Sequence, residues 1–276
     1  MITSYAKINL GLNVVEKRPD GYHNLQTVFY PVALKDSLEV FAMEEDFPSE
    51  YDCDIKVTNI HVEGDEQRNL VVKAYNILKE DFPSLPRLHA HLHKVIPTQA
   101  GMGGGSSDAS AMLLLLNRKF QLKLTEKQLI TYATRLGADC PFFIINRPSY
   151  AEGIGERLEP VNLDLSNWYI AIVRPDIPVP TKEAFARITP AFPQKCCKDI
   201  ISQPVETWRD ELTNDFEHSV FAIHPELSAI KQQLYHLGAT YAAMSGSGSA
   251  LFGLFKKPID IKKSFGNMFS TCFKMI

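Results

Sequence analysis

The chain has 276 residues, of which 45% are hydrophobic and 22% charged, the composition of a globular protein of one or two domains. Lys and Arg number 29 and Asp and Glu 32, so the formal net charge of -3 argues against bulk electrostatic binding of nucleic acid. The longest strongly apolar run, residues 111–116, is far shorter than the roughly 20 residues of a membrane-spanning helix. Residues 1–7 show no export signal, so we expect neither a membrane nor a nucleic acid as partner.

The number and spacing of the cysteines are typical of a protein in a reducing environment. The chain has five of them, an odd number that cannot pair completely within one molecule, and none lies in a CxxC spacing. Cys196 and Cys197 are adjacent, which suits neither an ordinary disulfide nor a zinc site. We therefore expect free thiols and a cytoplasmic location.

Strand-like and helix-like patterns interleave along the whole chain. From Ser4 to Val14 apolar residues alternate with polar ones, which predicts a strand with one buried face. Further strands are expected at residues 25–34, 37–43, 88–95, 168–173, 239–244 and 250–255, with a short one near Cys272. Helices are expected at residues 69–82, 106–120, 125–136, 225–237 and about 259–268, with a loop at 44–54 and a hairpin at 149–158. This order predicts an α+β or α/β fold, and residues 160–167 separate domain 1–160 from domain 161–276.

A glycine-rich stretch at residues 97–108 (PTQAGMGGGSSD) is the most informative feature. Four of the five residues from 101 to 105 are glycine, in a chain with only 15 glycines. Glycine permits positive φ angles, so successive backbone N–H groups can converge on an anion, and a helix with a Ser or Asp N-cap is expected directly afterwards. The stretch therefore predicts a phosphate site, where Ser106 or Ser107 could help to hold Mg²⁺ on a triphosphate. It matches neither a Walker A loop nor a GxGxxG fingerprint, and a flexible surface loop is the alternative.

A second glycine cluster, with Gly246 and Gly248, lies between two expected strands at residues 244–252. Taken alone, it is as consistent with a tight turn as with a binding loop. It gains a functional meaning only if the fold brings it to the first glycine stretch.

Two ionisable residues are candidates for phosphoryl transfer. Asp139 lies between an expected helix end and Pro141, a loop position that suits a catalytic group, although a capping or turn aspartate is the alternative. Lys7 shares the polar face of the first strand with Asn9, where a lysine is usually solvated. A carboxylate beside a lysine could orient and activate an attacking hydroxyl, but the spacing does not show whether the two residues meet.

Two further segments carry rings that could bind ligands. Tyr22 and His23 follow a Pro-Asp-Gly turn and could stack on and hydrogen-bond a base, with ordinary loop packing as the alternative. His89, His91 and His93 share one face of an expected strand. Because no fourth ligand is apparent and the intervening residues supply the buried face, we favour a solvated face over a zinc site.

These motifs together resemble those of the GHMP kinase superfamily over nearly the whole chain. The segments that carry the resemblance are 6–13 (AKINLGLN), 100–108 (AGMGGGSSD), 136–143 (LGADCPFF), 151–156 (AEGIGE) and 245–249 (SGSGS). Residues 18–27 (RPDGYHNLQT) resemble a substrate-binding stretch that one kind of kinase in this superfamily contains. Met102 stands where leucine is commoner, and residues 190–215 match only weakly.

The resemblance implies an α+β fold of two domains, the first like ribosomal protein S5 domain 2 and the second ferredoxin-like, with the active site between them. It also implies a small-molecule kinase that uses ATP and Mg²⁺ and transfers phosphate directly in line. The acceptor would be the 2-hydroxyl of a methylerythritol linked to cytidine diphosphate, in the non-mevalonate route to isoprenoids. We expect a monomer or a weak homodimer.

The resemblance further implies a role for each matching residue. Asp139 would be the catalytic base and Lys7 its partner, while Asn69 and Lys94 would lie near the adenine. The ATP phosphates would be wrapped by Pro97, Thr98, Gln99, Ala100, Gly101, Met102, Gly103, Gly104, Gly105, Ser106 and Ser107. The acceptor would contact Asn9, Tyr22, His23, Thr181, Phe185, Gly246 and Gly248, with the cytosine between Tyr22 and Phe185.

Two alternatives remain open at the level of the sequence. Another GHMP kinase, acting on homoserine or a mevalonate derivative, would share most of these motifs, and a panel of acceptor alcohols separates it from the favoured interpretation. A GHMP-fold binding protein without catalysis would have lost Asp139, Lys7 or the glycines, all of which are present.

Overall fold

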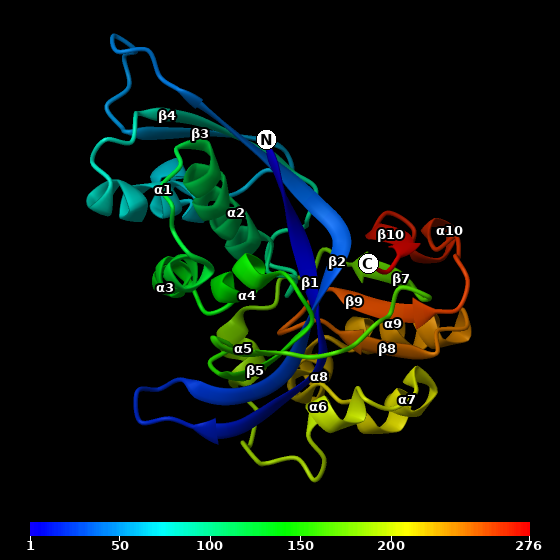
Figure 1. Cartoon of the computed structure of the whole chain (residues 1–276). Coiled ribbons are helices and arrows are strands. Elements are labelled where there is room, and N and C mark those ends of the chain that lie inside the picture. Colours follow the sequence, from blue (N-terminus) through cyan, green and yellow to red (C-terminus); the bar gives the residue numbers. More distant parts are fainter. The chain divides into compact units, whose positions relative to one another are not determined.

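The structure is a computed structural model that describes all 276 residues, and its chain forms two compact units (Figure 1). Unit 1 comprises Met1–Ala6, Leu34–Thr98 and Gly103–Arg147, and unit 2 comprises Lys7–Ala33, Gln99–Met102 and Pro148–Ile276. The chain passes between the units within strands β1 (Ile2–Lys17) and β2 (His23–Ala42) and in the glycine-rich stretch. The domain boundary between residues 160 and 161 stays a prediction. No helix is long and apolar enough to cross a membrane.

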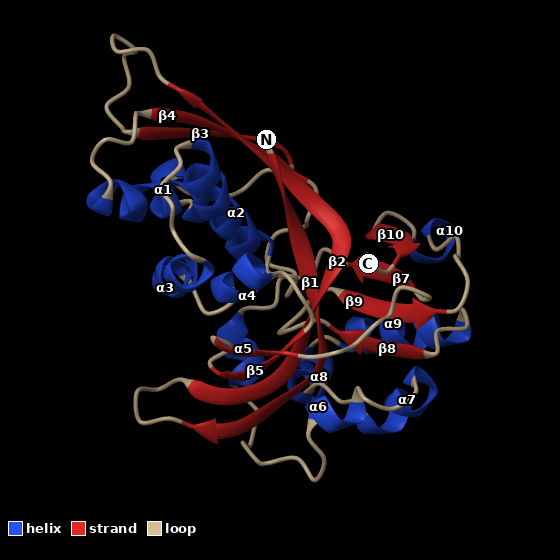
Figure 2. Cartoon of the chain, viewed as in Figure 1, coloured by secondary structure: helices blue, strands red, loops and turns tan.

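Unit 1 packs helices against one face of a sheet (Figure 2). Its strand order is β3–β4–β2, with β3 (Cys53–Asn59) parallel to β4 (Leu88–Lys94) and the second half of β2 antiparallel to β4. Its helices are α1 (Leu70–Asp81), α2 (Gly104–Lys119), α3 (Glu126–Leu136) and α4 (Cys140–Ile145), with a 3₁₀ turn at Glu66–Arg68. Helix α3 begins at a capping box on Thr125 and ends before Gly137, as predicted.

Histidines occupy the face of the β3–β4 ladder opposite the helices. His91 Nε2 and His93 Nδ1 lie 3.0 and 3.3 Å from the hydroxyl of Thr58, and His89 Nδ1 lies 3.9 Å from a carboxylate oxygen of Asp54. The intervening residues of β4 are buried in the core of unit 1, as the alternation predicts. No group of three His, Cys, Asp or Glu side chains lies where it could hold a metal ion.

Unit 2 contains an antiparallel sheet of order β10–β7–β9–β8, whose core includes residues of helices α8 and α9 (Figure 2). The strands are β7 (Tyr169–Arg174), β8 (Tyr241–Met244), β9 (Leu251–Phe255) and β10 (Phe269–Lys274). The helices are α5 (Thr181–Phe185), α6 (Cys197–Ile200), α7 (Trp208–Glu211), α8 (Asp215–Ile223), α9 (Pro225–His236) and α10 (Lys262–Phe265), with a 3₁₀ turn at Val205–Thr207. The predicted hairpin is confirmed as β5 (Ser149–Gly153) and β6 (Arg157–Pro160), which extends the first half of β2.

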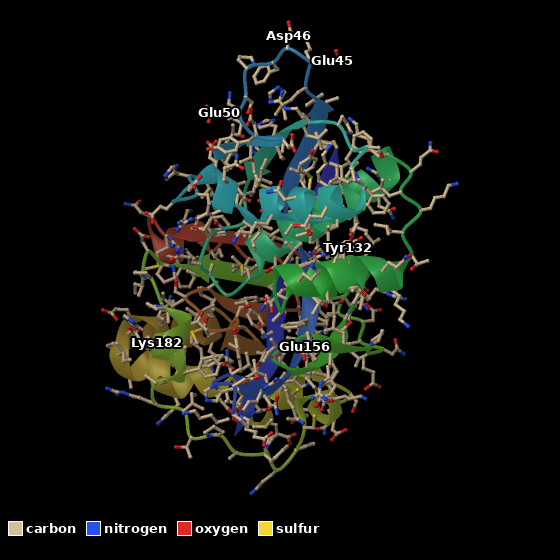
Figure 3. All side chains as sticks on the ribbon, turned by 90° about the vertical axis from the view of Figure 1, so that its left-hand side faces the viewer. Glu45, Asp46, Glu50, Tyr132, Glu156 and Lys182 are labelled. Carbon is tan, nitrogen blue, oxygen red and sulfur yellow. The ribbon has the colours of Figure 1, made fainter.

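Some predicted boundaries are wrong. The strands expected at 25–34 and 37–43 are one continuous strand, β2, because the charge of Asp36 is buried against Lys94 instead of breaking the strand. The loop expected at 44–54 ends at Asp52, where β3 follows, and Figure 3 labels Glu45 and Asp46 at its tip. Helix α10 has four residues instead of the ten expected, since Pro258 and Gly266 flank a short segment.

All five cysteines are free thiols. Cys197 is buried in unit 2, and this burial raises the pKa of its thiol. The thiol of Cys196 donates to the hydroxyl oxygen of Tyr150 at 3.5 Å. The burial and the raised pKa of Cys197 indicate an unreactive thiol.

Candidate active site

The two glycine-rich segments meet within unit 2. The hydroxyl of Ser245 donates to the carbonyl oxygen of Gly101 at 2.9 Å, and the Ala250 amide donates to that of Ala100 at 3.3 Å. Gly101 has a φ of +71°, and a Cβ added to it would lie 2.0 Å from the carbonyl oxygen of Ser245. Only glycine fits at that position. The condition under which the second cluster gains a functional meaning is therefore met.

The first glycine-rich segment has the backbone of an anion-binding loop. Gln99, Gly101 and Gly103 adopt left-handed conformations in alternation, with φ of 51°, 71° and 68°. Helix α2 begins at Gly104, two residues earlier than predicted, and Gly103 is its N-cap, without a side-chain capping bond. The prediction of a Ser or Asp cap is wrong because the left-handed turn at Gly103 starts the helix before those residues. The first turn contains no acidic residue, and the amides of its first three residues lack intrahelical partners, so this helix end favours an anion.

Lys7 is buried in unit 2, which excludes the solvated alternative. It is 4% exposed, and its Nζ donates to Asn9 Oδ1 at 2.7 Å and lies 4.8 Å from the ring centroid of Phe29. Asn9 in turn donates to the hydroxyl of Thr27 at 2.9 Å. The Lys7 amide donates to the carbonyl oxygen of Met102 at 3.0 Å, which joins β1 to the first glycine segment. The ammonium thus has a fixed position beside that segment.

Asp139 is the residue before helix α4 in unit 1. It occupies the N-cap position, yet its side chain makes no capping hydrogen bond. Pro141 in the first turn favours the start of this helix, because its ring fixes φ at a helical value. The half-buried side chain of Asp139 is therefore not a capping group. Since Asp139 and Lys7 belong to different units, their pairing stays a prediction.

Aromatic rings from two distant segments come together in unit 2. The rings of His23 and Phe185 stack with centroids 4.5 Å apart and an interplanar angle of 17°. Tyr22 is 61% exposed, and Thr181, at the start of α5, is exposed as well. Burial, helped by the charge of Lys17, lowers the pKa of His23, so its imidazole is neutral at pH 7. Flat rings and a neutral imidazole suit an uncharged aromatic ligand such as a nucleobase.

The two residues implied near the adenine already have protein partners in unit 1. The side chain of Asn69 caps α1 by accepting from the Val71 amide at 2.9 Å. The Lys94 ammonium donates to Asp36 Oδ2 at 2.5 Å and to Asp108 Oδ2 at 2.8 Å, and each of the three side chains is at most 3% exposed. The Lys94 ammonium is therefore committed to these carboxylates, and its role towards the adenine stays a prediction.

Two adjacent polar residues at the start of α8, one of which holds the second glycine segment, were not predicted from the sequence. Asn214 is buried, and its Nδ2 donates to the carbonyl oxygens of Met244 at 2.8 Å and Gly246 at 2.9 Å. Asp215 accepts from the backbone amide of Val14 at 2.8 Å, which ties α8 to β1. The available signal was an Asn-Asp pair before an apolar helical run, the pattern of a helix N-cap.

Asp108 is expected to make the stability of the protein depend on pH. Burial raises the pKa of Asp108 to about 7, against the opposing charge of Lys94, whereas its ordinary value is 3.8. Between these two values the folded chain binds a proton that the unfolded chain does not, so stability falls as the pH rises from about 4 to about 7. The Asp108→Asn variant lacks this titration.

The measurement is thermal unfolding of both proteins at constant ionic strength. The Tm of Asp108→Asn minus that of the wild type should grow from about pH 4 to about pH 7 and then level off. A difference that shrinks with rising pH, or stays constant, would contradict the expectation.

The chain matches the family model for the N-terminal domain of GHMP kinases over residues 69–147 and the model for their C-terminal domain over residues 198–269. It belongs to the GHMP kinase family and is therefore a phosphotransferase that uses ATP. The predicted α+β fold class is thereby confirmed.

Within that family the chain resembles three kinases over nearly its whole length. The 4-diphosphocytidyl-2-C-methyl-D-erythritol kinase of Parabacteroides distasonis is 49% identical over 268 residues, which cover 97% of this chain and 95% of the relative. The kinase of the same name from Bacteroides fragilis (strain YCH46) is 50% identical over 258 residues, covering 94% and 93%. A crystal structure of 4-(cytidine 5'-diphospho)-2C-methyl-D-erythritol kinase matches with a TM-score of 0.82 and 30% identity over 99% of this chain and 98% of that one.

Proposed function

We propose that the protein transfers the γ-phosphate of ATP to the 2-hydroxyl of 4-diphosphocytidyl-2-C-methyl-D-erythritol, in the non-mevalonate route to isoprenoids. The observation that carries this proposal is the identity of 49% and 50%, over nearly the full length, to kinases named for that acceptor. A homoserine kinase structure shares only 16% identity and a mevalonate kinase structure 12%, a likeness of fold alone. The stacked rings of His23 and Phe185 support a nucleobase on the acceptor, which neither homoserine nor mevalonate carries.

The phosphates of ATP would bind to the loop from Pro97 to Ser107. The left-handed residues of the loop and the unpaired amides at the start of α2 support this placement, since both direct N–H groups at an anion. Asn69 and Lys94 would lie near the adenine. We place the acceptor against Asn9, Tyr22, His23, Thr181, Phe185, Gly246 and Gly248.

Mg²⁺ would be bound mainly through the phosphates of ATP. The protein offers no cluster of three acidic or histidine side chains, but Mg²⁺ commonly keeps its waters and takes only one or two protein ligands. The hydroxyls of Ser106 and Ser107, in the first turn of α2, fit that requirement. When bound, the ion supplies charge neutralisation on the phosphate oxygens.

The chemical step would be a direct in-line transfer without a phosphoenzyme. Asp139 would accept the proton of the attacking hydroxyl while the oxygen of that hydroxyl forms a bond to the γ-phosphorus. At the same time the bond between the γ-phosphorus and the bridging oxygen would break, and ADP would leave with that oxygen. Lys7, oriented by Asn9, would keep Asp139 ionised and lower the pKa of the hydroxyl through its positive charge.

Mass spectrometry of the product formed from ATP, Mg²⁺ and the cytidylyl alcohol tests the proposal. The expected product carries one additional phosphoryl group on the methylerythritol part, as located by fragmentation. Homoserine and mevalonate serve as comparison acceptors. Turnover with either of them, and none with the cytidylyl alcohol, would replace the proposal by its alternative.

Replacing the exposed ring of Tyr22 should weaken binding of the acceptor without affecting binding of ATP. We expect Tyr22→Ala to raise the KM for the cytidylyl alcohol by about 5- to 150-fold, because stacking on a base contributes roughly 1–3 kcal/mol. The KM for ATP should stay unchanged in the same steady-state measurement. Tyr51→Ala, which removes a tyrosine of similar exposure (50%) from unit 1, is the control. A rise in the KM for ATP alone would mean that the two pockets are interchanged.

A further inference from the structure

A buried ionic cluster lies at the base of the glycine-rich loop in unit 1. Its centre is the ammonium of Lys94, held between the carboxylates of Asp36 and Asp108. The other oxygen of Asp36 accepts from the backbone amides of Val95 and Ile96, the latter at 2.8 Å. Asp36 therefore fixes the strand end from which the chain enters the loop.

The same cluster fixes the helix by which the chain leaves the loop. Asp108 lies in the second turn of α2, and its Oδ1 accepts from the hydroxyl of Ser4 at 2.6 Å while its Oδ2 accepts from Lys94. A Cβ added to Gly104, the first residue of α2, would lie 3.2 Å from Lys94 Nζ. The first turn of the helix thus rests directly on the ammonium, and both ends of the loop are held by one group.

The composition of the cluster is unusual for a stabilising contact. Two carboxyl groups share one ammonium at almost zero exposure, so above about pH 7, where Asp108 is ionised as well, one negative charge stays uncompensated in the interior. Burying charges is costly, and well-packed apolar residues in such places are often neutral or stabilising by comparison. What the cluster does provide is a fixed geometry, because every carboxylate oxygen has a defined donor.

We propose that Asp108 is a positioning residue for the nucleotide. Through Lys94 it holds the first turn of α2 against the strand end at Ile96, and this arrangement presents the loop amides to the phosphates of ATP in a preformed geometry. The inference rests on the proposed binding of those phosphates to the loop from Pro97 to Ser107.

The test measures the equilibrium affinity of the full-length protein for a non-hydrolysable ATP analogue with Mg²⁺, in the absence of acceptor. Asp108→Ala removes the link and should weaken the affinity by about 10- to 100-fold, the effect expected when a binding group is displaced by about 1 Å. Asp108→Asn retains an acceptor for Lys94 and a donor for Ser4, and should restore the affinity to within about threefold of the wild type. Steady-state kinetics should show the same changes in the KM for ATP and none in the KM for the acceptor.

Met112→Ala is the matched control for loss of stability. Met112 is fully buried on α2, one turn beyond Asp108, and its truncation leaves a cavity but removes none of the hydrogen bonds of the cluster. Its affinity for the analogue should stay within about twofold of the wild type, the usual scatter for independent sites. Equal losses in Asp108→Ala and Met112→Ala would overturn the proposal, as would an Asp108→Asn variant no better than Asp108→Ala.

Different measurements test the proposed acceptor and the proposed positioning role of Asp108. A wild type that binds the analogue but does not phosphorylate the cytidylyl alcohol would refute the acceptor and leave the affinity comparison intact. If Asp108→Ala bound the analogue as tightly as the wild type, the positioning role would be refuted, whatever the acceptor.

Discussion

Asp139→Asn should lower kcat by about 10²- to 10⁴-fold, the contribution usual for a general base in the transition state. Asparagine is nearly isosteric, and since the Asp139 side chain makes no capping bond, helix α4 should form normally in the variant. Affinity for the ATP analogue should therefore remain close to that of the wild type. The measurement is single-turnover transfer to the cytidylyl alcohol, together with the affinity for the analogue.

Asp46→Asn is the control for this substitution. Asp46 is an exposed loop aspartate, labelled at the tip of the loop after β2 in Figure 3, and it has no assigned role. Its kcat should stay within about twofold of the wild type, as is usual for surface changes. Near-normal turnover in Asp139→Asn would remove the assignment of Asp139 as base, and loss of nucleotide affinity would point to a binding role instead.

Gly101→Ala should both destabilise the protein and abolish the alignment of the two glycine segments. A left-handed alanine costs roughly 1–2 kcal/mol, and overpacking costs typically 1–3 kcal/mol, so we expect a loss of about 2–5 kcal/mol of unfolding free energy. The added Cβ would lie 2.0 Å from the carbonyl oxygen of Ser245, so one of the two segments has to move. Denaturant unfolding measures the loss of unfolding free energy. Turnover should fall at least as much as the folded fraction of the protein does.

Gly105→Ala separates this effect from a general intolerance of side chains in the loop. Its Cβ would meet nothing closer than Leu70 Cδ1 at 3.8 Å, and the residue lies in the first turn of α2. Alanine there should leave the unfolding free energy unchanged or raise it by up to about 1 kcal/mol through helix propensity. If Gly101→Ala were as stable as Gly105→Ala, the close approach of Gly101 and Ser245 would be wrong.

Local patterns in the sequence predicted most elements of the fold because those elements depend on local signals. Helix α3 is marked at both ends by Thr125 and Gly137, and the alternation in β4 places its histidines on one face. The failures arise where a distant partner changes the meaning of a residue. Asp36 suggests a strand break until Lys94, 58 positions away, compensates its charge inside a continuous strand.

The candidate site shows the same division. The glycine content of residues 101–105 was enough to predict the left-handed backbone of the loop, since glycine conformations are a local property. That Ser245 would reach Gly101, that Phe185 would stack on His23 and that Asn214 would hold the second segment depends on contacts over long sequence separations. Spacing alone contains no information about such pairs, and the burial of Lys7 was hidden for the same reason.

The shared ammonium of Lys94 also limits how the interior of unit 1 can evolve. Exchange of Lys94 for an apolar residue leaves two buried carboxylates without a positive partner. Loss of Asp36 leaves two backbone amides without an acceptor. Asp108→Asn is the one single step that removes the excess charge and leaves every donor matched. Mutational paths through this part of the protein therefore have a preferred order, in which a neutral amide at position 108 precedes any change of Lys94.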